Sequence, residues 1–361
     1  MTELKAWRHD PLAAAGGFIP TFTLLIAFGL LFGGRLTFKI AIVNDDSGPY
    51  GLMLRETFDA ATSPFGTPYY DVEDLSADAA WEVYEAFRLD GIWIIPSDFS
   101  ERVESGQNPA VEMVFNNYND DRAKNHRIYA AEILWRFYER VGYPAAPLAM
   151  AEEYPMPVMV AWFPVIAVGI ILLGVTIGGM FNIYMLTFKE QTAGITLEFG
   201  LAPRSLLWVL APKALLALLM ALATGTVLLG VCAVWPGIWP GKFIWGFWLL
   251  SGLTALFWIA LALLVGLNTR EYMPGAIASI LTGLTVFFIG GGLSIIRNHE
   301  ADVLLAAWFF PNTYAVDPLR DLILFHTMPA DWNVTLLKLS GFAILAIGVG
   351  FGLASRQLRR L

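Results

Sequence analysis

Six long apolar stretches limit what this chain can fold into. They lie at approximately residues 12–34, 158–186, 206–234, 243–267, 273–296 and 334–355. A helix needs roughly 20 mainly apolar residues to cross about 30 Å of hydrocarbon, and each stretch approaches or exceeds that length. Hydrophobic residues make up 57% of the chain and charged residues only 15%, with a mean hydropathy of +0.58. The pattern predicts a polytopic α-helical membrane protein with about six spanning helices.

The first apolar stretch has an alternative interpretation. Lys5 and Arg8 precede it, which is also the pattern of a secretory signal peptide. No small-x-small cleavage site follows Phe32, where the chain continues as GGRLTFK, and five more apolar stretches come later. We therefore expect a first spanning helix rather than a cleaved signal.

Basic residues gather in the segments that would share one side of the membrane. With the N-terminus inside, the cytoplasmic segments contain Lys5, Arg8, Lys189, Arg204, Lys213, Arg270, Arg356, Arg359 and Arg360. These outnumber the acidic residues of the same segments, although the whole chain has a net charge of −8. Because Lys and Arg are retained inside, the pattern predicts a plasma (inner) membrane protein with both termini in the cytoplasm. The acidic outer side disfavours nucleic acid as a partner.

Residues 37–157 differ from the rest, because they lose the long apolar runs and gain mixed charge. Strands are expected over 38–43, 68–73, 91–96 and 111–115, and helices over 51–61, 77–89, 97–105 and 121–141. This alternation predicts an α/β sheet with packed helices. Ser97, ahead of Asp98 and Glu101, is expected to be a helix N-cap.

The predicted organisation has three parts. Residues 1–36 form an N-terminal cytoplasmic segment and the first spanning helix. Residues 37–157 form an extracytoplasmic α/β domain, which a proline-containing linker returns to the membrane. Residues 158–361 form a five-helix transmembrane domain.

The sequence predicts neither a set of catalytic side chains nor a set of metal ligands. Asp45, Asp46 and Asp98 lie at strand ends without a nucleophile or metal cluster, so solvated turns and caps are the favoured interpretation. The four histidines have no ligand spacing. Cys232 is the single cysteine, so it has no disulfide partner and is expected to be a small buried residue.

The apolar stretches contain almost no ionisable residues, which disfavours a transporter driven by protons. They also predict no polar cluster within the membrane, which weighs against a membrane enzyme. The chain has no G-x-x-x-x-G-K-[ST] phosphate loop, and GIWPGKF at 237–243 lacks both the spacing and the Ser/Thr. A pump built on this chain would therefore take its energy from ATP bound by another subunit.

Aromatic residues and glycines mark the predicted ends of the spans. Interfacial anchoring is expected for Trp235, Trp239, Trp245, Trp248, Trp308, Phe309 and Phe310. The run Gly290 to Gly292 is expected to break a helix or to pack closely against one.

The segment 187–213 is predicted to lie in the cytoplasm between the second and third spans. Within 187–204, Phe188, Ile195 and Phe199 fall on roughly one helical face and the charged residues fall elsewhere. This amphipathic pattern favours either an interfacial helix along the membrane or an ordinary surface helix.

Several motifs spread over the chain resemble one family. An acid, a Gly, a Pro nine residues after the Gly and a Lys ten residues later correspond to Glu190, Gly194, Pro203 and Lys213. The segment RHDPLAAAGGFIP, with Asp10 and Pro11, is similar to that family's Arg-Asp-Pro approach to the first span. Pro311 and Tyr314 resemble its Pro-x-x-Tyr segment before the last span, and DGIWIIPSDFSERVESG at 90–106 resembles its outer domain. The family is the permease subunits of type 2 ABC exporters, in the branch with a large extracytoplasmic domain after the first span.

Two positions depart from the family pattern. Ile195 and Leu197 stand where the family has Thr and Glu, and the acid is displaced to Glu198. An altered contact with the ATPase, as in the less regular member of a heterodimeric pair, is one interpretation.

The resemblance implies a non-catalytic permease subunit that exports an amphiphilic or hydrophobic substrate. ATP and Mg are expected on a partner ATP-binding cassette ATPase. The expected contact residues are Lys189, Glu190, Gly194, Glu198 and Pro203. A second permease chain, membrane lipid and a periplasmic adaptor are further expected partners. The alternative is a non-transporting membrane receptor or scaffold with an extracytoplasmic ligand-binding domain.

Overall fold

The chain is described by a computed structural model. It describes residues 11–32, 37–63, 66–86, 88–107, 109–115, 120–142, 162–195, 207–269, 271–293 and 305–358. The chain divides into two compact units, one of Met1–Gly34 with Tyr154–Leu361 and the other of Arg35–Glu153. Each unit has its own hydrophobic core.

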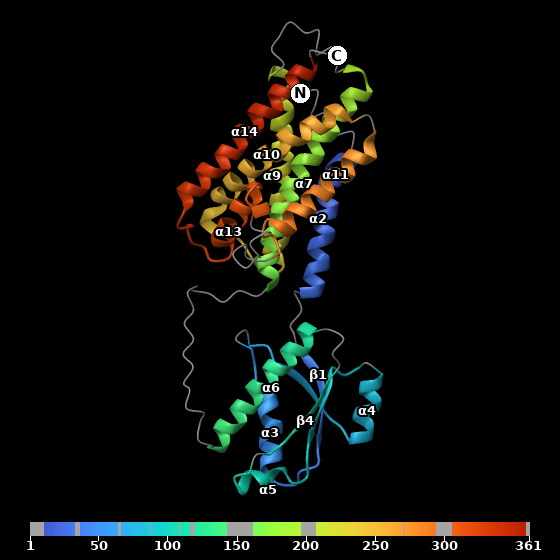
Figure 1. Cartoon of the computed structure of the whole chain (residues 1–361), viewed down its shortest axis with the longest axis vertical. Coiled ribbons are helices and arrows are strands. Elements are labelled where there is room, and N and C mark those ends of the chain that lie inside the picture. The colour runs from blue at the N-terminus through green and yellow to red at the C-terminus, as the bar shows by residue number, and fades with distance from the viewer. Residues whose placement is uncertain are drawn as a thin grey trace. The chain divides into compact units, whose positions relative to one another are not determined.

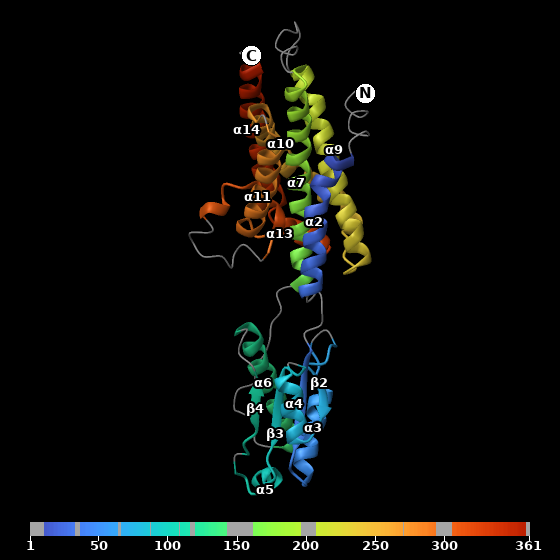
Figure 2. The same cartoon turned by 90° about the vertical axis from the view of Figure 1, so that its right-hand side faces the viewer.

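The first unit is a bundle of long helices that run roughly alongside one another (Figures 1 and 2). Its helices are α2 (Pro11–Phe32), α7 (Trp162–Thr192), α9 (Leu207–Val234), α10 (Ile244–Asn268), α11 (Tyr272–Ile289), the short α13 (Pro311–Ile323) and α14 (Trp332–Leu358). Within the described residues, α7, α9, α10, α11 and α14 are long and apolar enough to cross a membrane. These five helices confirm the prediction of a polytopic membrane protein.

Helix α2 is part of this bundle. Its Leu25 is 1% exposed and belongs to the same buried cluster as Phe163 and Leu228. Phe18, Phe22 and other apolar residues of α2 pack against the cluster. These contacts make α2 part of the helix bundle.

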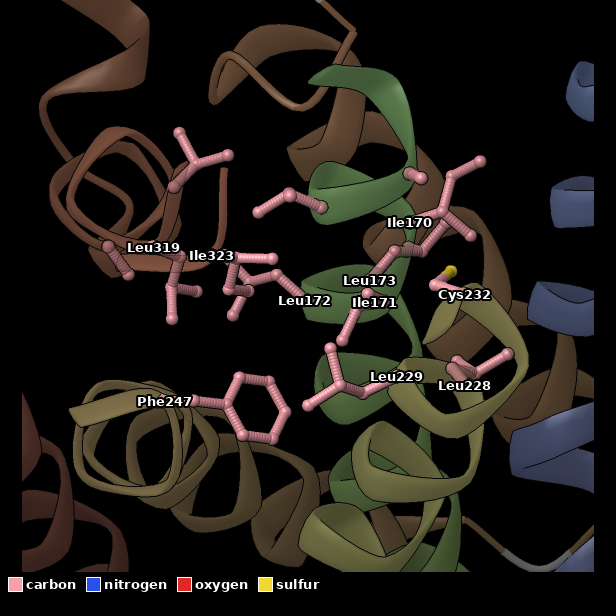
Figure 3. Close-up of a cluster of buried hydrophobic side chains, with 14 of the residues drawn as sticks. Ile170, Ile171, Leu172, Leu173, Leu228, Leu229, Cys232, Phe247, Leu319 and Ile323 are labelled. Carbon is pink, nitrogen blue, oxygen red and sulfur yellow. The ribbon is translucent and has the colours of Figure 1, made fainter. Parts of the chain in front are cut away.

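Helix α7 is the centre of the bundle. Nearly every residue from Phe163 to Met185 is buried, and its Ile170 to Leu173 segment meets Leu228 and Cys232 of α9 (Figure 3). Figure 3 also labels Leu229 of α9, Phe247 of α10, and Leu319 and Ile323 of α13, which belong to the same buried cluster. Cys232 is 0% exposed, which agrees with the expected small buried residue. A helix that is apolar on all sides is stable only when other apolar groups surround it.

Helix α7 continues beyond the apolar stretch that predicts it, to Thr192, whereas α9 lies within its predicted stretch. The end of α7 therefore includes Lys189 and Glu190, so it is not free of charge. The expected interfacial helix over 187–204 is wrong at its start, because residues 187–192 are the last turns of α7.

The aromatic residues expected to be interfacial anchors differ in exposure. Trp235, Trp239, Trp245 and Trp248 are each more than 40% exposed, whereas Phe310 is partly buried and stacks on Trp258. Gly290 follows the last residue of α11 and donates its N–H to the Val286 carbonyl. A side chain at Gly169 would collide with the Gly292 backbone, so this turn packs directly on α7.

The second unit is a four-stranded sheet with helices on both faces. Its strands are β1 (Phe38–Asn44), β2 (Tyr70–Asp74), β3 (Gly91–Ile95) and β4 (Glu112–Phe115), in the order β2-β1-β3-β4. Its helices are α3 (Pro49–Ala60), α4 (Ala77–Glu85), α5 (Phe99–Glu104) and α6 (Asp120–Val141). Strand β1 is parallel to β2 and to β3, whereas β3 and β4 are antiparallel. All eight elements overlap the ranges that the alternating pattern predicts.

The chain order explains why the helices lie on two faces. The path from β1 through α3 reaches β2 on one side, and the path through α4 returns across β1 to β3. Right-handed crossovers in opposite directions place their helices on opposite faces of a sheet. One buried cluster accordingly joins the sheet to α3, α5 and α6, and another joins it to Ala80 of α4 (Figure 1).

The start of α5 differs from the prediction. Its N-cap is Asp98, not Ser97, and no side chain makes a capping hydrogen bond. Asp98 instead pairs with Arg102 at 2.6 Å, one turn along the helix. Glu101 does lie in the first turn, where the helix dipole favours a negative charge.

Candidate functional site

The last turns of α7 form the first candidate site, because they hold a buried ion pair. Glu190 of α7 accepts a hydrogen bond from the ammonium group of Lys213 in α9. The Lys213 side chain is 2% exposed and the Glu190 side chain 19%. Removing a charge from water is costly unless a partner compensates it, so the two helix ends are held together by each other's charge. The structure thus brings together two residues that are 23 positions apart in the sequence.

Tyr184 connects the same turns of α7 to α10 and α11. Its hydroxyl lies 2.8 Å from the Glu271 carbonyl and 2.9 Å from the Tyr272 carbonyl, in the connection between those two helices. The phenol ring is fully buried, and Phe188 stacks against it one turn further along α7. Displacement of the end of α7 would therefore act on both neighbouring helices.

Helix α14 joins this end of the bundle through an amide pair. The Gln357 side-chain nitrogen donates to the Leu267 carbonyl at 3.2 Å and to the Asn268 side chain at 2.9 Å. Three separate polar contacts thus join the ends of these helices: α7 to α9, α7 to the start of α11, and α10 to α14. We call these contacts the helix-end cluster, defined by Tyr184, Glu190, Lys213, Asn268 and Gln357.

Gly194 lies directly beyond α7. Its φ of +74° is in the left-handed region, and its N–H donates to the Gln191 carbonyl at 3.2 Å. Glycine adopts this conformation without a steric penalty and commonly ends helices in this way. The residue is exposed, and a Cβ added to it would meet nothing within 4 Å. The local role of Gly194 is therefore to end α7, and among the described residues none lies within 4 Å of a Cβ at this position.

The other motif residues of this region are only partly described. Lys189 is exposed on the last turn of α7, and Pro11 is the first residue of α2. Asp10, Glu198 and Pro203 lie outside the described residues. Of the residues expected to contact the ATPase, the structure describes Lys189, Glu190 and Gly194. Glu190 forms the ion pair with Lys213.

A second candidate site surrounds α13, which contains Pro311 and Tyr314. Pro311 occupies the first helical position, where its fixed φ is favourable and no N–H is needed. The Tyr314 hydroxyl donates to the Trp308 carbonyl at 3.1 Å, and the Lys338 ammonium lies 4.8 Å from the centre of its ring. Both residues therefore have local structural roles at the start of α13.

The last turn of α13 carries a buried arginine that the sequence motifs do not indicate. The Arg320 guanidinium donates to the Gly291 and Gly292 carbonyls at 2.8 and 3.1 Å, and to the Val165 carbonyl of α7 at 3.3 Å. It also pairs with Asp317 at 2.7 Å. Arginine is suited to this position because its planar group presents five donors. The sequence shows Arg320 between Asp317 and Asp321, a pattern that does not reveal its burial.

A polar network lies inside the bundle, so the prediction of no intramembrane polar cluster is wrong. The Trp258 indole donates to the Asn312 side-chain oxygen at 2.7 Å, and the Asn312 amide donates to the Thr176 hydroxyl at 2.9 Å. Trp258 and Thr176 belong to membrane-capable helices, and Asn312 lies in the first turn of α13. These neutral groups satisfy one another, which is the usual arrangement of polar groups in an apolar interior. Nothing in the trio supplies a nucleophile or a general base.

The aspartates of the α/β unit also have structural roles. Asp46 is 8% exposed, so the expectation of a solvated turn is wrong for this residue. It accepts hydrogen bonds from the Ser100 hydroxyl at 2.6 Å, the Ser100 N–H at 3.2 Å and the Gly51 N–H at 3.0 Å. Burial acts to raise the pKa of Asp46, but the hydrogen bonds from Ser100 and Gly51 together hold that pKa below its usual value. Asp45 is exposed, as expected.

Asp46 should make the α/β unit sensitive to acid. A group whose pKa is lower in the folded state contributes stability above its unfolded pKa, and that stability is lost as the pH falls through the folded value. We expect Asp46→Ala to destabilise β1 and α3 by about 2 kcal/mol at pH 7, with the difference shrinking below about pH 4. Hydrogen exchange of these segments, corrected for intrinsic rates, would measure it. Asp45→Ala is the matched control, and a difference that does not change with pH would contradict the assignment.

No group of three or more potential metal-binding side chains occurs among the described residues. The membrane-capable helices are connected at one end by the helix-end cluster. Helix α13 connects α7 to the turn that follows α11. This architecture defines a multi-pass membrane protein.

Comparison with known proteins identifies the family. A family model described as ABC-2 family transporter protein matches residues 17–355, which is most of the chain. The protein therefore belongs to the ABC-2 transporter family, whose permeases are normally non-catalytic and work with an ATPase in a partner chain. No curated protein and no solved structure matches this chain.

Proposed function

We propose that this protein is the permease subunit of an ATP-driven exporter. Two permease chains, identical or different, form the translocation path, and ATP and Mg bind to two partner ATPase subunits. Both termini and the helix-end cluster lie in the cytoplasm, and the α/β unit lies outside. The substrate is amphiphilic or hydrophobic, because the described parts of the spans contain few ionisable groups.

The observation that carries this proposal is the helix-end cluster. Glu190, which the family resemblance assigns to the ATPase contact, is bonded to Lys213 of α9. Tyr184, on the same turns, is bonded to the α10–α11 connection. A force applied just beyond α7 would therefore reach three other helices through direct contacts, which is what coupling between two distinct sites requires.

The open surface at Gly194 supports the same proposal. The residue is exposed, and within the part of the chain that the structure describes nothing lies within 4 Å of a Cβ built on it, which supports a close approach of a partner to the backbone. Lys189, also exposed, lies one turn earlier and could contribute a charge to the contact. We also propose that the α/β unit is the part of the chain that a periplasmic adaptor protein contacts.

Gly194→Trp tests the assignment when it is compared with Gly194→Ala. Both substitutions place a side chain at a φ of +74°, so they share a strain of about 1–2 kcal/mol. Only Trp adds bulk at the proposed contact. We expect both variants to fold, and the Trp variant to lose at least tenfold in ATP-dependent export while the Ala variant loses much less. Equal export by the two variants would refute the contact at Gly194.

A further inference from the structure

A lysine lies within the membrane-capable helix α14. Lys338 is the seventh residue of this helix, which runs over 27 residues from Trp332 to Leu358. A helix of that length measures about 40 Å, against about 30 Å of hydrocarbon, so a centred α14 extends only about 5 Å beyond the hydrocarbon at each end. The backbone of Lys338 is about 9 Å from the start of the helix and therefore lies just inside the hydrocarbon.

Lys338 is exposed, and its neighbours on the same side of α14 are apolar. Val334, Gly341 and Leu345 share that side, because they stand four residues before, three after and seven after the lysine. Val334 is 49% exposed and Leu345 66%. Gly341 is exposed as well, and a Cβ added to it would meet none of the described residues within 4 Å. Charged residues of spanning helices usually face the bundle interior, so a lysine on an exposed apolar side needs an explanation.

A tyrosine ring holds the lysine in place. The Lys338 ammonium lies 4.8 Å from the centre of the Tyr314 ring of α13, a helix beside the first turns of α14 (Figure 1). The same ring lies 5.7 Å from that of Phe342, and its hydroxyl donates to the Trp308 carbonyl. Contacts on both sides therefore fix Tyr314. Its ring attracts the cation through the π-face but supplies no oxygen acceptor, so the three N–H donors of the ammonium still call for one.

The nearby acidic residues do not neutralise Lys338. Asp317 of α13 pairs with Arg320 at 2.7 Å. Asp331 is on the same side of α14 as Lys338 but seven residues before it, which is about 10 Å toward the start of the helix. Within the part of the chain that the structure describes, the ring of Tyr314 is the contact of the ammonium, and no acid pairs with it. An anion from outside the chain would complete the site, because an uncompensated charge near hydrocarbon is costly.

The depth of the lysine indicates which anion this is. A lysine stem extends several ångströms along a helix, so the ammonium can reach the level of the lipid head groups. Exposed aromatic residues mark that level, since Trp308 is 55% and Phe309 75% exposed. The anions at this level of a membrane are lipid phosphates. We propose that Lys338, held by Tyr314, binds the phosphate of an anionic phospholipid whose acyl chain lies against Gly341 and Leu345.

The binding is expected to be selective rather than tight. The acyl chain gains no hydrophobic driving force, because the lipid tails that it leaves are as apolar as leucine. The ion pair with the phosphate supplies the preference, and it is partly screened because the lysine is exposed. The site should therefore enrich anionic lipid severalfold. In the orientation proposed above, this lipid belongs to the outer leaflet, but its binding requires neither that orientation nor an ATPase.

Two photoreactive phospholipids test this site. One is a phosphatidylglycerol and the other a phosphatidylcholine, each with a diazirine at the same position of one acyl chain. Each is added at the same mole fraction to the full-length chain in phosphatidylcholine nanodiscs, and mass spectrometry maps the adducts after irradiation. We expect severalfold more adducts from phosphatidylglycerol on residues 334–345, and equal adducts from the two lipids at the exposed Ile277 and Leu281 of α11. Equal adducts on residues 334–345 would overturn the proposal.

Lysine variants make the test decisive. Lys338→Gln should abolish the phosphatidylglycerol excess on residues 334–345, whereas Lys338→Arg should keep most of it because the charge remains. Lys242→Gln is the matched control, since Lys242 is also exposed, lies 5.1 Å from the centre of the Phe243 ring and precedes the first residue of α10. An excess that persists in Lys338→Gln, or that Lys242→Gln removes equally, would overturn the proposal.

Inorganic phosphate distinguishes the source of the anion. Added at constant ionic strength, it should leave the phosphatidylglycerol excess unchanged, because a soluble ion lacks the chain that lies against α14. Loss of the excess would show that the site takes soluble phosphate, and the assignment to a lipid would be wrong. No ATPase takes part in these experiments, so their outcome is independent of the export proposed above.

Discussion

Glu190→Gln is expected to lower the free energy of unfolding by about 3 kcal/mol. Removing one partner of a buried ion pair typically costs about 3–5 kcal/mol, because the remaining charge stays out of water. The Lys213 ammonium is the remaining charge here, and its side chain is 2% exposed. The lower end of the range applies because the Glu190 side chain is 19% exposed and is partly solvated before the change.

A double-mutant cycle would isolate the pair. Lys213→Met alone should be milder, because it removes the more deeply buried charge and leaves Glu190 near water. The double variant should recover much of the loss caused by Glu190→Gln, since neither charge then remains. Thermal unfolding in detergent gives each value. Lys189→Gln, at the exposed neighbouring position, should change stability by less than about 0.5 kcal/mol. Similar losses in Glu190→Gln and Lys189→Gln would contradict a buried pair.

The same double-mutant cycle tests whether the ion pair couples the ATPase to movement of the helices. If the ion pair transmits force from α7 to α9, the double variant should restore stability without restoring ATP-dependent export. Tyr184→Phe offers an independent comparison, because it removes only the hydroxyl that bonds to the Glu271 and Tyr272 carbonyls. A variant that regains both stability and export would show that the pair serves the fold alone.

The sequence predicted the elements well because their signals are local. Roughly 20 apolar residues in a row have one common structural meaning, and α7, α9, α10, α11 and α14 lie where those runs occur. The alternation of short strands and helices likewise located β1 to β4. The limits of α7 were wrong because hydropathy marks where lipid ends, whereas the helix continues until Gly194 supplies a left-handed residue.

The polar contacts could not be predicted, because their partners are far apart in the chain. Asn312 bonds to Thr176 across 136 positions, and Arg320 bonds to Val165 across 155 positions. No periodic pattern encodes such pairs. The motif match names Glu190 and Lys213, but it does not indicate that they bond to each other. Asp46 shows the same limit, since its partner Ser100 is 54 positions away.

Arg320→Leu is expected to cause the other large effect, a loss of about 4 kcal/mol in stability. Arg320 is 4% exposed, and its guanidinium donates to carbonyls of Gly291 and Gly292. Leucine would leave these carbonyls without that donor and would remove the cation paired with Asp317. Each buried acceptor that loses its donor costs about 1–3 kcal/mol, and the loss of the pair with Asp317 adds less, because the Asp317 side chain is 31% exposed.

Arg320→Lys separates charge from geometry at this position. Lysine keeps the positive charge, but its ammonium is a compact group on a flexible stem and cannot reproduce a planar fork directed at several carbonyls. We therefore expect Arg320→Lys to recover less than half of the loss, with the remaining damage localised to α13 and residues 290–293. Hydrogen exchange of those segments would locate it. Arg356→Leu is the matched control, since Arg356 is exposed and should tolerate the change within about 0.5 kcal/mol. Full recovery by lysine would show that Arg320 acts through its charge on Asp317, and that its hydrogen bonds do not hold the Gly291–Gly292 turn against α7.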